Sequence, residues 1–436
     1  MVIRIKKGAH FGFGCLLAFL IALLIARYSF NMDIPRIVLT SVVIAIAIIG
    51  NQSEILAILL CCIALHEAID FYIALFACIV ILVAKNLRFM KASVSMVCGL
   101  VMLLWELLHC FAFHISFTPL VIAIMPMVVL IILLNYDISE IDYPFIVRSL
   151  GIISVAVCAV VLMNNIVQAD FNFVKAVLGL QRLGVISKNA TLLGGHINPN
   201  SLGVINVLVV TGMLQLRSLN RQTKTDYILS IILIVFGVLT SSRTFLICLS
   251  IMVILLIIGQ KGSTRKKIRF FVALLAIALV VVVLMLWLFP SVLEYYIGRF
   301  QVKDITSGRY SLMLQYHSYI ISHPWVLLFG IGSTDLSYKA MNIYQIANNS
   351  PHNSIQEIVL AWGLPGLLMI GLLVFIMFME SKRYHEKKIL LNFIPLIIIL
   401  TKSMAGQLLT SSYSMLALMF AYLSLCQDFT STGQPN

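Results

Sequence analysis

Charged residues are scarce in this chain. Asp, Glu, Lys and Arg make up only 11% of its 436 residues, whereas a soluble domain has about 25%. Hydrophobic residues make up 61%, and the apolar runs, of roughly 15–22 residues, are long enough to cross about 30 Å of hydrocarbon. A soluble domain is therefore excluded, and so is a large β-barrel, whose strands would alternate between apolar and polar residues. We expect an all-α polytopic integral membrane protein.

Several enzyme motifs are missing as well. There is no phosphate-binding G-x-x-x-x-G-K-S/T loop, no dinucleotide-binding G-x-G-x-x-G, no zinc-ligand spacing and no D-x-D. The polar group His66, Glu67 and Asp70 has no matched second cluster, so we expect no metal and no other cofactor. Glu106 is a lone acid in an apolar run, and we expect it to have a buried partner. The cysteines all fall in or beside apolar runs and are interpreted as small buried hydrophobic side chains: Cys15, Cys61, Cys62, Cys78, Cys98, Cys110, Cys158, Cys248 and Cys426.

Acidic residues are fewer than basic ones, 17 against 30, which gives a net charge of +13. The Lys and Arg residues form short clusters between apolar runs, which is the pattern of cytoplasmic loops in membrane proteins. We therefore expect no nucleic-acid partner. The beginning, M-V-I-R-I-K-K, resembles a signal peptide, but no A-x-A-like cleavage site follows it. We interpret the first apolar run as an uncleaved span.

We predict about 12–14 transmembrane helices, all within one integral membrane domain, residues 1–436. The third and fourth apolar runs are short and are separated by His66–Asp70, so they could instead form one kinked or re-entrant element. The predicted spans are 9–27, 34–50, 54–66, 69–84, 92–113, 118–134, 144–163, 197–216, 226–240, 244–260, 268–289, 352–379, 389–402 and 410–426.

The basic residues also predict the orientation of the chain. With a cytoplasmic N-terminus, 18 of the 30 Lys and Arg residues lie in the N-terminal segment and the short inner loops. Eleven, including Lys402, are spread over the outer segments. The positive-inside rule therefore places both termini in the cytoplasm.

Two of the outer segments, 164–196 and 290–351, are long, and long connections are usually functional. We predict a first long external loop at 164–196 and a large external catalytic loop at 290–351. Each loop is expected to carry a helix lying in the membrane interface, at 171–185 and at Tyr310–Ile321. The second helix should end before His323-Pro324, because the residue before a proline disfavours helix.

Four arginines on the predicted outer side are candidate ligands for a lipid-linked phosphate: Arg182, Arg243, Arg299 and Arg309. A guanidinium holds phosphate oxygens with two parallel donors and keeps its charge. Arg243 lies in a tight hairpin, where an outward-facing basic residue runs against the positive-inside bias. The alternative is an arginine whose side chain extends to the interface. Arg309 begins a helix, where the helix dipole disfavours a cation, although a solvated arginine is the simpler alternative.

Polar residues at the outer ends of two spans form a second set of candidates. His352 and Asn353 begin one span, and histidine can take a proton from a hydroxyl near neutral pH. Glu357 lies about one turn further in, where it could orient His352 or pair with an arginine, or form a purely structural pair. Asn200 begins another span and could contact substrate. For His352 and Asn200, helix capping is a sufficient alternative explanation.

A set of short motifs follows a characteristic order along the chain. The motifs are N-P-N-S-L-G at Asn198–Gly203, T-S-S-R-T at Thr240–Thr244, G-R-Y at Gly308–Tyr310, H-P-W-V-L-L-F-G-I-G at His323–Gly332, and H-N at His352–Asn353 with Gly363 and Gly366 after it. In this order, over about residues 180–370, the chain resembles the superfamily of O-antigen polymerases and O-antigen ligases. The N-terminal third is similar to that superfamily only in its hydropathy.

The resemblance implies an inverting membrane glycosyltransferase whose donor is an oligosaccharide linked to undecaprenyl diphosphate. It implies that Arg243, Arg309 and, less directly, Arg182 bind the diphosphate, and that His352 and Glu357 act in catalysis. The physical chemistry agrees, because a diphosphate leaving group mainly needs charge stabilisation and an acceptor hydroxyl needs a base. The glycine that follows Arg309 is Gly330, a spacing that departs from one described for polymerases and leaves the subclass open.

The leading hypothesis is a repeat-unit polymerase for capsule, exopolysaccharide or O-antigen at the outer face of the bacterial cytoplasmic membrane. It would transfer glycan to the non-reducing end of another lipid-linked unit. The alternative is an O-antigen ligase, which moves finished glycan to lipid A core or another acceptor. A flippase should carry paired polar breaks near mid-membrane, and none is found. The expected partners are the lipid-linked donor and acceptor, membrane lipids, a chain-length regulator and a flippase.

Overall fold

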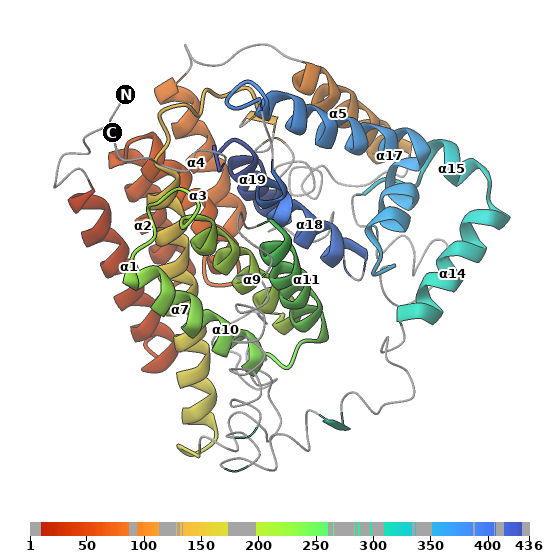
Figure 1. The fold of residues 1–436 in the computed structure, drawn as a ribbon. Coiled ribbons are helices and arrows are strands. Elements are labelled where there is room, and N and C mark those ends of the chain that lie inside the picture. Colours follow the sequence, from red (N-terminus) through yellow and green to blue (C-terminus); the bar gives the residue numbers. More distant parts are fainter. Residues whose placement is uncertain are drawn as a thin grey trace. The chain divides into compact units, whose positions relative to one another are not determined.

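All the elements in the described part of the chain are α-helices (Figure 1). The computed structural model describes residues 10–86, 94–112, 128, 131–132, 134–172, 198–259, 265, 283, 287, 297–298, 309–333, 336, 351–386, 389–404, 406 and 414–429. Within these residues, four helices are long and apolar enough to cross a membrane: α1 (Phe11–Ser29), α5 (Val94–Ala112), α7 (Tyr143–Gln168) and α17 (Ser354–Ser381). The predicted class, an all-helical membrane protein, is confirmed.

The chain divides into two compact units, of which the first comprises residues 1–88 and 138–242. Helix α3 is at the centre of this unit: nearly all its residues are buried, and it packs against α7, α2 and α4. Helix α9 packs against α10 and α7. Besides α1 and α7, the helices of unit 1 are α2 (Arg36–Ile49), α3 (Gln52–Leu65), α4 (Phe71–Asn86), α9 (Pro199–Gln215) and α10 (Lys224–Leu239).

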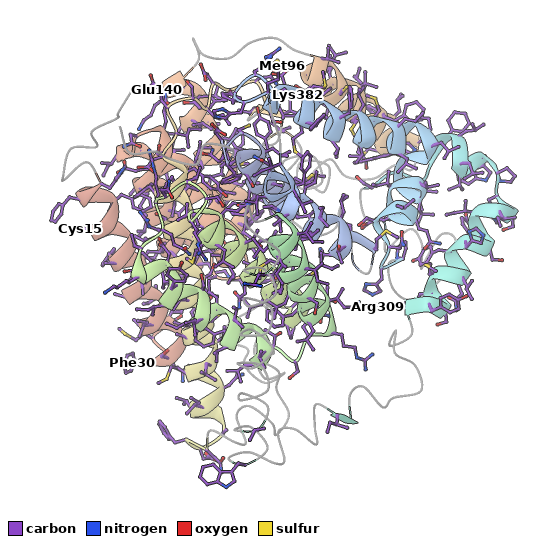
Figure 2. All side chains as sticks on the ribbon, viewed as in Figure 1. Cys15, Phe30, Met96, Glu140, Arg309 and Lys382 are labelled. Carbon is purple, nitrogen blue, oxygen red and sulfur yellow. The ribbon has the colours of Figure 1, made fainter. Side chains whose placement is uncertain are left out.

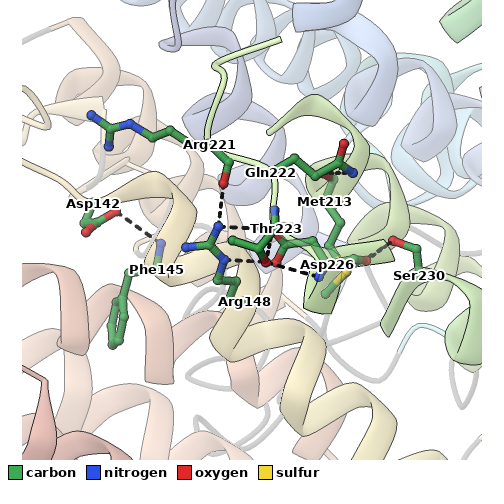
Figure 3. A network of polar contacts seen from close by, with 9 residues as sticks. All are labelled: Asp142, Phe145, Arg148, Met213, Arg221, Gln222, Thr223, Asp226 and Ser230. Atoms are coloured by element: carbon green, nitrogen blue, oxygen red, sulfur yellow. Dashed lines mark hydrogen bonds and ion pairs between the residues drawn. The ribbon is translucent and has the colours of Figure 1, made fainter. Parts of the chain in front are cut away.

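A partly buried ion pair joins α7 to the beginning of α10 in unit 1 (Figure 3). Arg148 donates from Nε to one carboxylate oxygen of Asp226 at 2.9 Å and from a terminal nitrogen to the other at 3.0 Å. The same carboxylate accepts from the backbone N–H of Thr223 at 2.7 Å and so caps α10. Arg148 also donates to the carbonyl of Arg221. The positive charge of Arg148 is therefore paired with the Asp226 carboxylate, and both oxygens of that carboxylate accept hydrogen bonds.

The polar group at residues 66–70 forms the turn between α3 and α4. His66 contacts Glu67 at 3.5 Å and the carbonyl of Ile63 at 2.9 Å, and the backbone N–H of Asp70 donates to Thr40. The third and fourth apolar runs are thus two separate helices. The cysteine interpretation is correct for all but Cys15, which is exposed on a helix whose outward residues are apolar.

The second unit comprises residues 89–137 and 243–436. Within it, α17 packs against α15, α5, α14 and α18, and α18 also packs against α11 and α19. The helices of this unit besides α5 and α17 are α11 (Arg243–Gly259), α14 (Arg309–Ser322), α15 (Trp325–Phe329), α18 (Leu390–Met404) and α19 (Ser414–Leu425). The predicted helix at Tyr310–Ile321 is confirmed as α14, and it ends before His323-Pro324 as expected.

Helix α17 is broken at Gly363, where the backbone turns to φ 67°. Pro365 has no N–H, so it cannot bond the carbonyl of Ala361 four residues earlier. The segment after α15 supplies the missing donors: Ile331 N–H bonds the carbonyl of Leu360 at 2.8 Å, and Gly332 N–H bonds that of Ala361 at 2.7 Å. Residues 331 and 332 therefore supply two of the hydrogen bonds that α17 lacks at its break.

Two glycines with positive φ allow this close approach. A Cβ at Gly330 would overlap the backbone of Ala361, and a Cβ at Gly363 would lie 2.8 Å from backbone atoms of Leu328. Neither position can carry a side chain without moving the backbone. This contact explains why glycines occur in both F-G-I-G and W-G-L-P-G.

The expected partner of Glu106 lies in the same assembly. A carboxylate oxygen of Glu106, in α5, accepts from Trp362 Nε1 at 2.6 Å and from the backbone N–H of Ser333 at 3.0 Å. Trp105 donates to the carbonyl of Phe329 at 3.2 Å. Helix α5 thus bonds both to Trp362, just before the break in α17, and to the segment 329–333 that packs against the break. The prediction of a buried partner for Glu106 is confirmed.

Most predicted spans agree with described helices to within a few residues, for example 34–50 with α2 and 244–260 with α11. The predicted spans 118–134 and 268–289 lie largely outside the described residues, as does the predicted interfacial helix at 171–185.

Candidate active site

Arg309 is the first residue of α14 and is half-buried. Figure 2 labels it at the end of this helix. One turn further along the helix, the backbone and side chain of Met313 contact α17: Gln356 Nε2 donates to the Met313 carbonyl at 3.0 Å, and Asn353 Nδ2 lies 4.0 Å from its sulfur. Arg309 is therefore brought to the beginning of α17.

His352 directly precedes α17 and is also half-buried. Its backbone has φ 55°, a left-handed conformation that is uncommon outside glycine. The next residue, Asn353, is the N-cap: its Oδ1 accepts from the N–H groups of Ile355 at 3.0 Å and Gln356 at 3.2 Å. The left-handed backbone of His352 and the capped helix after it together fix the position of the His352 backbone, from which the imidazole extends.

Arg243 begins α11, immediately after the turn that joins it to α10. Ser241 has φ 49° in this turn, which reverses the chain over very few residues. Arg243 is half-buried, like Arg309 and His352. Each of the three residues thus stands at the beginning of a helix, where backbone N–H groups and the dipole favour an anion.

The three side chains lie close enough to act on one another electrostatically. Burial, and next the charge of Arg243, lowers the pKa of Arg309 from its ordinary value of 12.5. The guanidinium nevertheless stays protonated. Burial, and next the charge of Arg309, lowers the pKa of His352 below its ordinary 6.5. At neutral pH the cluster therefore holds two fixed positive charges and a neutral imidazole that can accept a proton.

The comparison with protein families covers this part of the chain. Residues 228–371 match the family model described as O-antigen ligase. The match agrees with the resemblance to the O-antigen polymerase and ligase superfamily. No curated protein matches the chain.

The matched region, residues 228–371, contains the described cluster of Arg243, Arg309 and His352, together with the cap Asn353. Glu357 is also within the matched region, fully buried in the first turn of α17. Burial, and next the charge of Glu357, raises the pKa of Tyr316 in α14 to about 12. The predicted catalytic role of Glu357 stays a prediction, as does a substrate contact by Asn353, whose amide already caps the helix.

The other candidates lie in unit 1 or outside the described residues. Asn200 is in α9 of unit 1, where its Oδ1 accepts from Ser242 Oγ at 2.8 Å. Arg182 and Arg299 lie outside the described residues. Their roles in substrate binding remain predictions.

Sequence reasoning missed several residues that surround this cluster or lie near the beginning of α17. Gln356 and Met313 join α14 to α17, and the charge of Glu357 acts on Tyr316. Lys402, considered only as one of several outer charges, is buried in the last turn of α18. The available signal was a lysine placed inside an apolar helix, where an ionisable residue indicates function.

Proposed function

We propose that the protein is a polysaccharide repeat-unit polymerase. It would transfer a glycan from a polyprenyl diphosphate to the non-reducing end of another lipid-linked repeat unit, with inversion at the anomeric carbon. The observation that supports this most directly is the clustering of Arg243, Arg309 and His352 at three helix beginnings in the region that matches the O-antigen ligase family model.

In this proposal, the two arginines bind the diphosphate of the donor. Their planar donors match phosphate oxygens, and burial strengthens the attraction because water screens it less. As the bond from the anomeric carbon to the phosphate oxygen breaks, its electron pair moves onto the diphosphate. A preorganised pair of guanidinium groups stabilises that developing charge more than the charge of the bound donor.

His352 would act on the acceptor. Its lowered pKa keeps the imidazole neutral at pH 7, so it can take the proton of the acceptor hydroxyl while the oxygen attacks the anomeric carbon. Attack from the face opposite the diphosphate inverts the configuration. Glu357 is proposed to support this step from within the helix, and Arg182, Arg299, Asn200 and Asn353 to contribute to donor or glycan binding.

We further propose that both termini are cytoplasmic and that the cluster faces the outside of the inner membrane, in the external loop 290–351 and its boundaries. A chain-length regulator and a flippase would be its partners. The description of the matched family model also supports a ligase, which would use the same donor chemistry with lipid A core or another acceptor.

The test is a gel of surface glycan from a deletion strain complemented with wild type, His352→Ala or His317→Ala. His317 is an exposed histidine on α14 and serves as the matched control. Polymerase activity predicts that His352→Ala loses the ladder while single repeats still reach their final acceptor, and that His317→Ala keeps it. Long polymer left on the lipid carrier would identify a ligase. An unchanged ladder would contradict both enzymatic roles.

A further inference from the structure

The end of α18 is hydrogen-bonded to the beginning of α17, beside His352. Asn353 Nδ2 donates to the carbonyl of Met404 at 3.5 Å, and Ser354 Oγ donates to that of Gly406 at 3.1 Å. Met404 and Gly406 of unit 2 therefore lie next to the cap that precedes α17 and follows His352.

Lys402 lies in this last turn of α18, and only 8% of it is exposed. Its aliphatic stem runs along Gly406: a Cβ on that glycine would lie 3.3 Å from Lys402 Cε and 3.8 Å from its Cδ. Gly406 is the residue whose carbonyl binds Ser354. The stem of Lys402 therefore extends toward the beginning of α17.

Helix α11 brings Arg243 to the same end of the unit. Gly259, the last residue of α11, lies against Leu391 near the beginning of α18. Cys248 Sγ lies 4.0 Å from the carbonyl of Ile398, one turn before Lys402, and the charge of Lys402 acts on Cys248. The two helices are thus antiparallel, and the beginning of α11 is level with the end of α18.

We infer that Lys402 is a further cation of the diphosphate site formed by Arg243 and Arg309. This inference rests on the proposed function, because it assigns a ligand of the same donor. Lys402 lies outside the residues that match the family model. The alternative is a purely structural role, since a lysine in the last turn of a helix is also stabilised by the helix's own carbonyls.

The chemistry gives a compact ammonium a distinct task. Each guanidinium binds phosphate as a planar fork, whereas an ammonium is a point charge that can approach the bridging region from any direction. The departing polyprenyl diphosphate gains negative charge as its bond to the sugar breaks. A third fixed positive charge would therefore bind the leaving group more strongly than the intact donor.

The experiment measures binding of inorganic pyrophosphate to the full-length protein in detergent by calorimetry. Lys402→Met keeps the stem without the charge, and Lys402→Arg keeps the charge. If Lys402→Met does not accumulate in the membrane, Lys402→Gln, which retains a donor for helix carbonyls, takes its place. The matched control is Lys85→Met, because Lys85 ends α4 and donates to the carbonyls of Ile48 at 2.6 Å and Gly50 at 2.7 Å in unit 1.

We expect Lys402→Met or Lys402→Gln to weaken pyrophosphate binding about tenfold, the effect of one lost charged hydrogen bond. Lys402→Arg should retain most of the affinity, and Lys85→Met all of it. Wild-type affinity in both uncharged Lys402 variants, with Arg309→Ala impaired, would overturn the role of Lys402 and leave the proposed function intact. Wild-type affinity in Arg309→Ala as well would overturn the diphosphate site itself.

Discussion

Arg148 in unit 1 and Arg309 in unit 2 both lie beside the beginning of a helix, but their named electrostatic neighbours differ in sign. Arg148 meets the carboxylate of Asp226 and a backbone carbonyl. Arg309 lies within the field of Arg243 and itself acts on His352. The first arrangement satisfies a charge inside the fold. The second gathers like charges, which costs free energy in the empty protein and becomes favourable when an anion binds.

This contrast separates structural arginines from ligand-binding ones without any appeal to motifs. In unit 1, Arg148 joins two helices, so its removal should lower the stability of the fold. In unit 2, Arg243 and Arg309 lie near one another, so the removal of either should lower the transfer activity. The predictions below test the contrast from both sides.

The largest effect is expected for Arg309. Replacing it with Ala should lower the transfer rate about 100- to 1000-fold, the usual loss when a transition-state charge stabiliser is removed. Arg309→Lys should remain poor, because a point charge does not replace the bidentate fork. Polymer formed per folded molecule is the measurement, and Arg383→Ala, on an arginine whose side chain is 66% exposed, is the control. Full activity in Arg309→Ala would place Arg309 with Arg148 as a structural residue.

The opposite outcome is expected for Arg148. Arg148→Ala leaves the buried Asp226 carboxylate without its counter-charge and should destabilise the protein by up to about 3 kcal/mol, below the largest losses for buried pairs because the arginine is about one-third exposed. Thermal unfolding in detergent would measure this loss. Activity per folded molecule should be unchanged. Arg148→Met with Asp226→Asn should recover part of the stability, since neither charge is then left alone.

The smallest effect is a shift in pH dependence. His352 must be neutral to accept a proton, and burial and Arg309 lower its pKa below 6.5. The kcat/KM of the wild type should therefore fall in acid only below pH 6.5. In Arg309→Gln the pKa should rise toward its ordinary value, so the acid limb of the residual activity should move to higher pH. Arg309→Lys keeps the charge and should keep the wild-type limb; identical profiles in all three would mean that Arg309 does not influence His352.

Local rules were sufficient to predict where the site's helices begin and end. Pro324 predicted the end of α14, because the residue before a proline disfavours helix. The apolar run predicted a span from residue 352, and α17 begins at Ser354. Arg309 and His352 were predicted for the same reason: both stand at such boundaries, and the structure brings them together.

The break in α17 was not predicted. The run 352–379 was predicted as one continuous span, and the donors that replace its missing hydrogen bonds come from Ile331 and Gly332, 29 residues earlier. A rule that considers only a few neighbouring residues cannot connect Ile331 with Leu360 or Gly332 with Ala361. Lys402 was counted only among the outer charges. Its place beside the beginning of α17 depends on contacts of Met404 and Gly406 with Asn353 and Ser354, which are distant in the sequence.

The hydrogen bonds from Ile331 and Gly332 to α17 also imply that α17 and this loop segment fold together. A carbonyl without a hydrogen bond costs several kcal/mol in hydrocarbon, so the inserted helix is incomplete until residues 330–332 have reached it. The part of α17 between His352 and Gly363 therefore becomes a stable helix only when residues 330–332 fold against it. Until residues 330–332 pack against α17, the position of His352 at the beginning of that helix is not fixed. We therefore expect activity to require that this loop segment is folded.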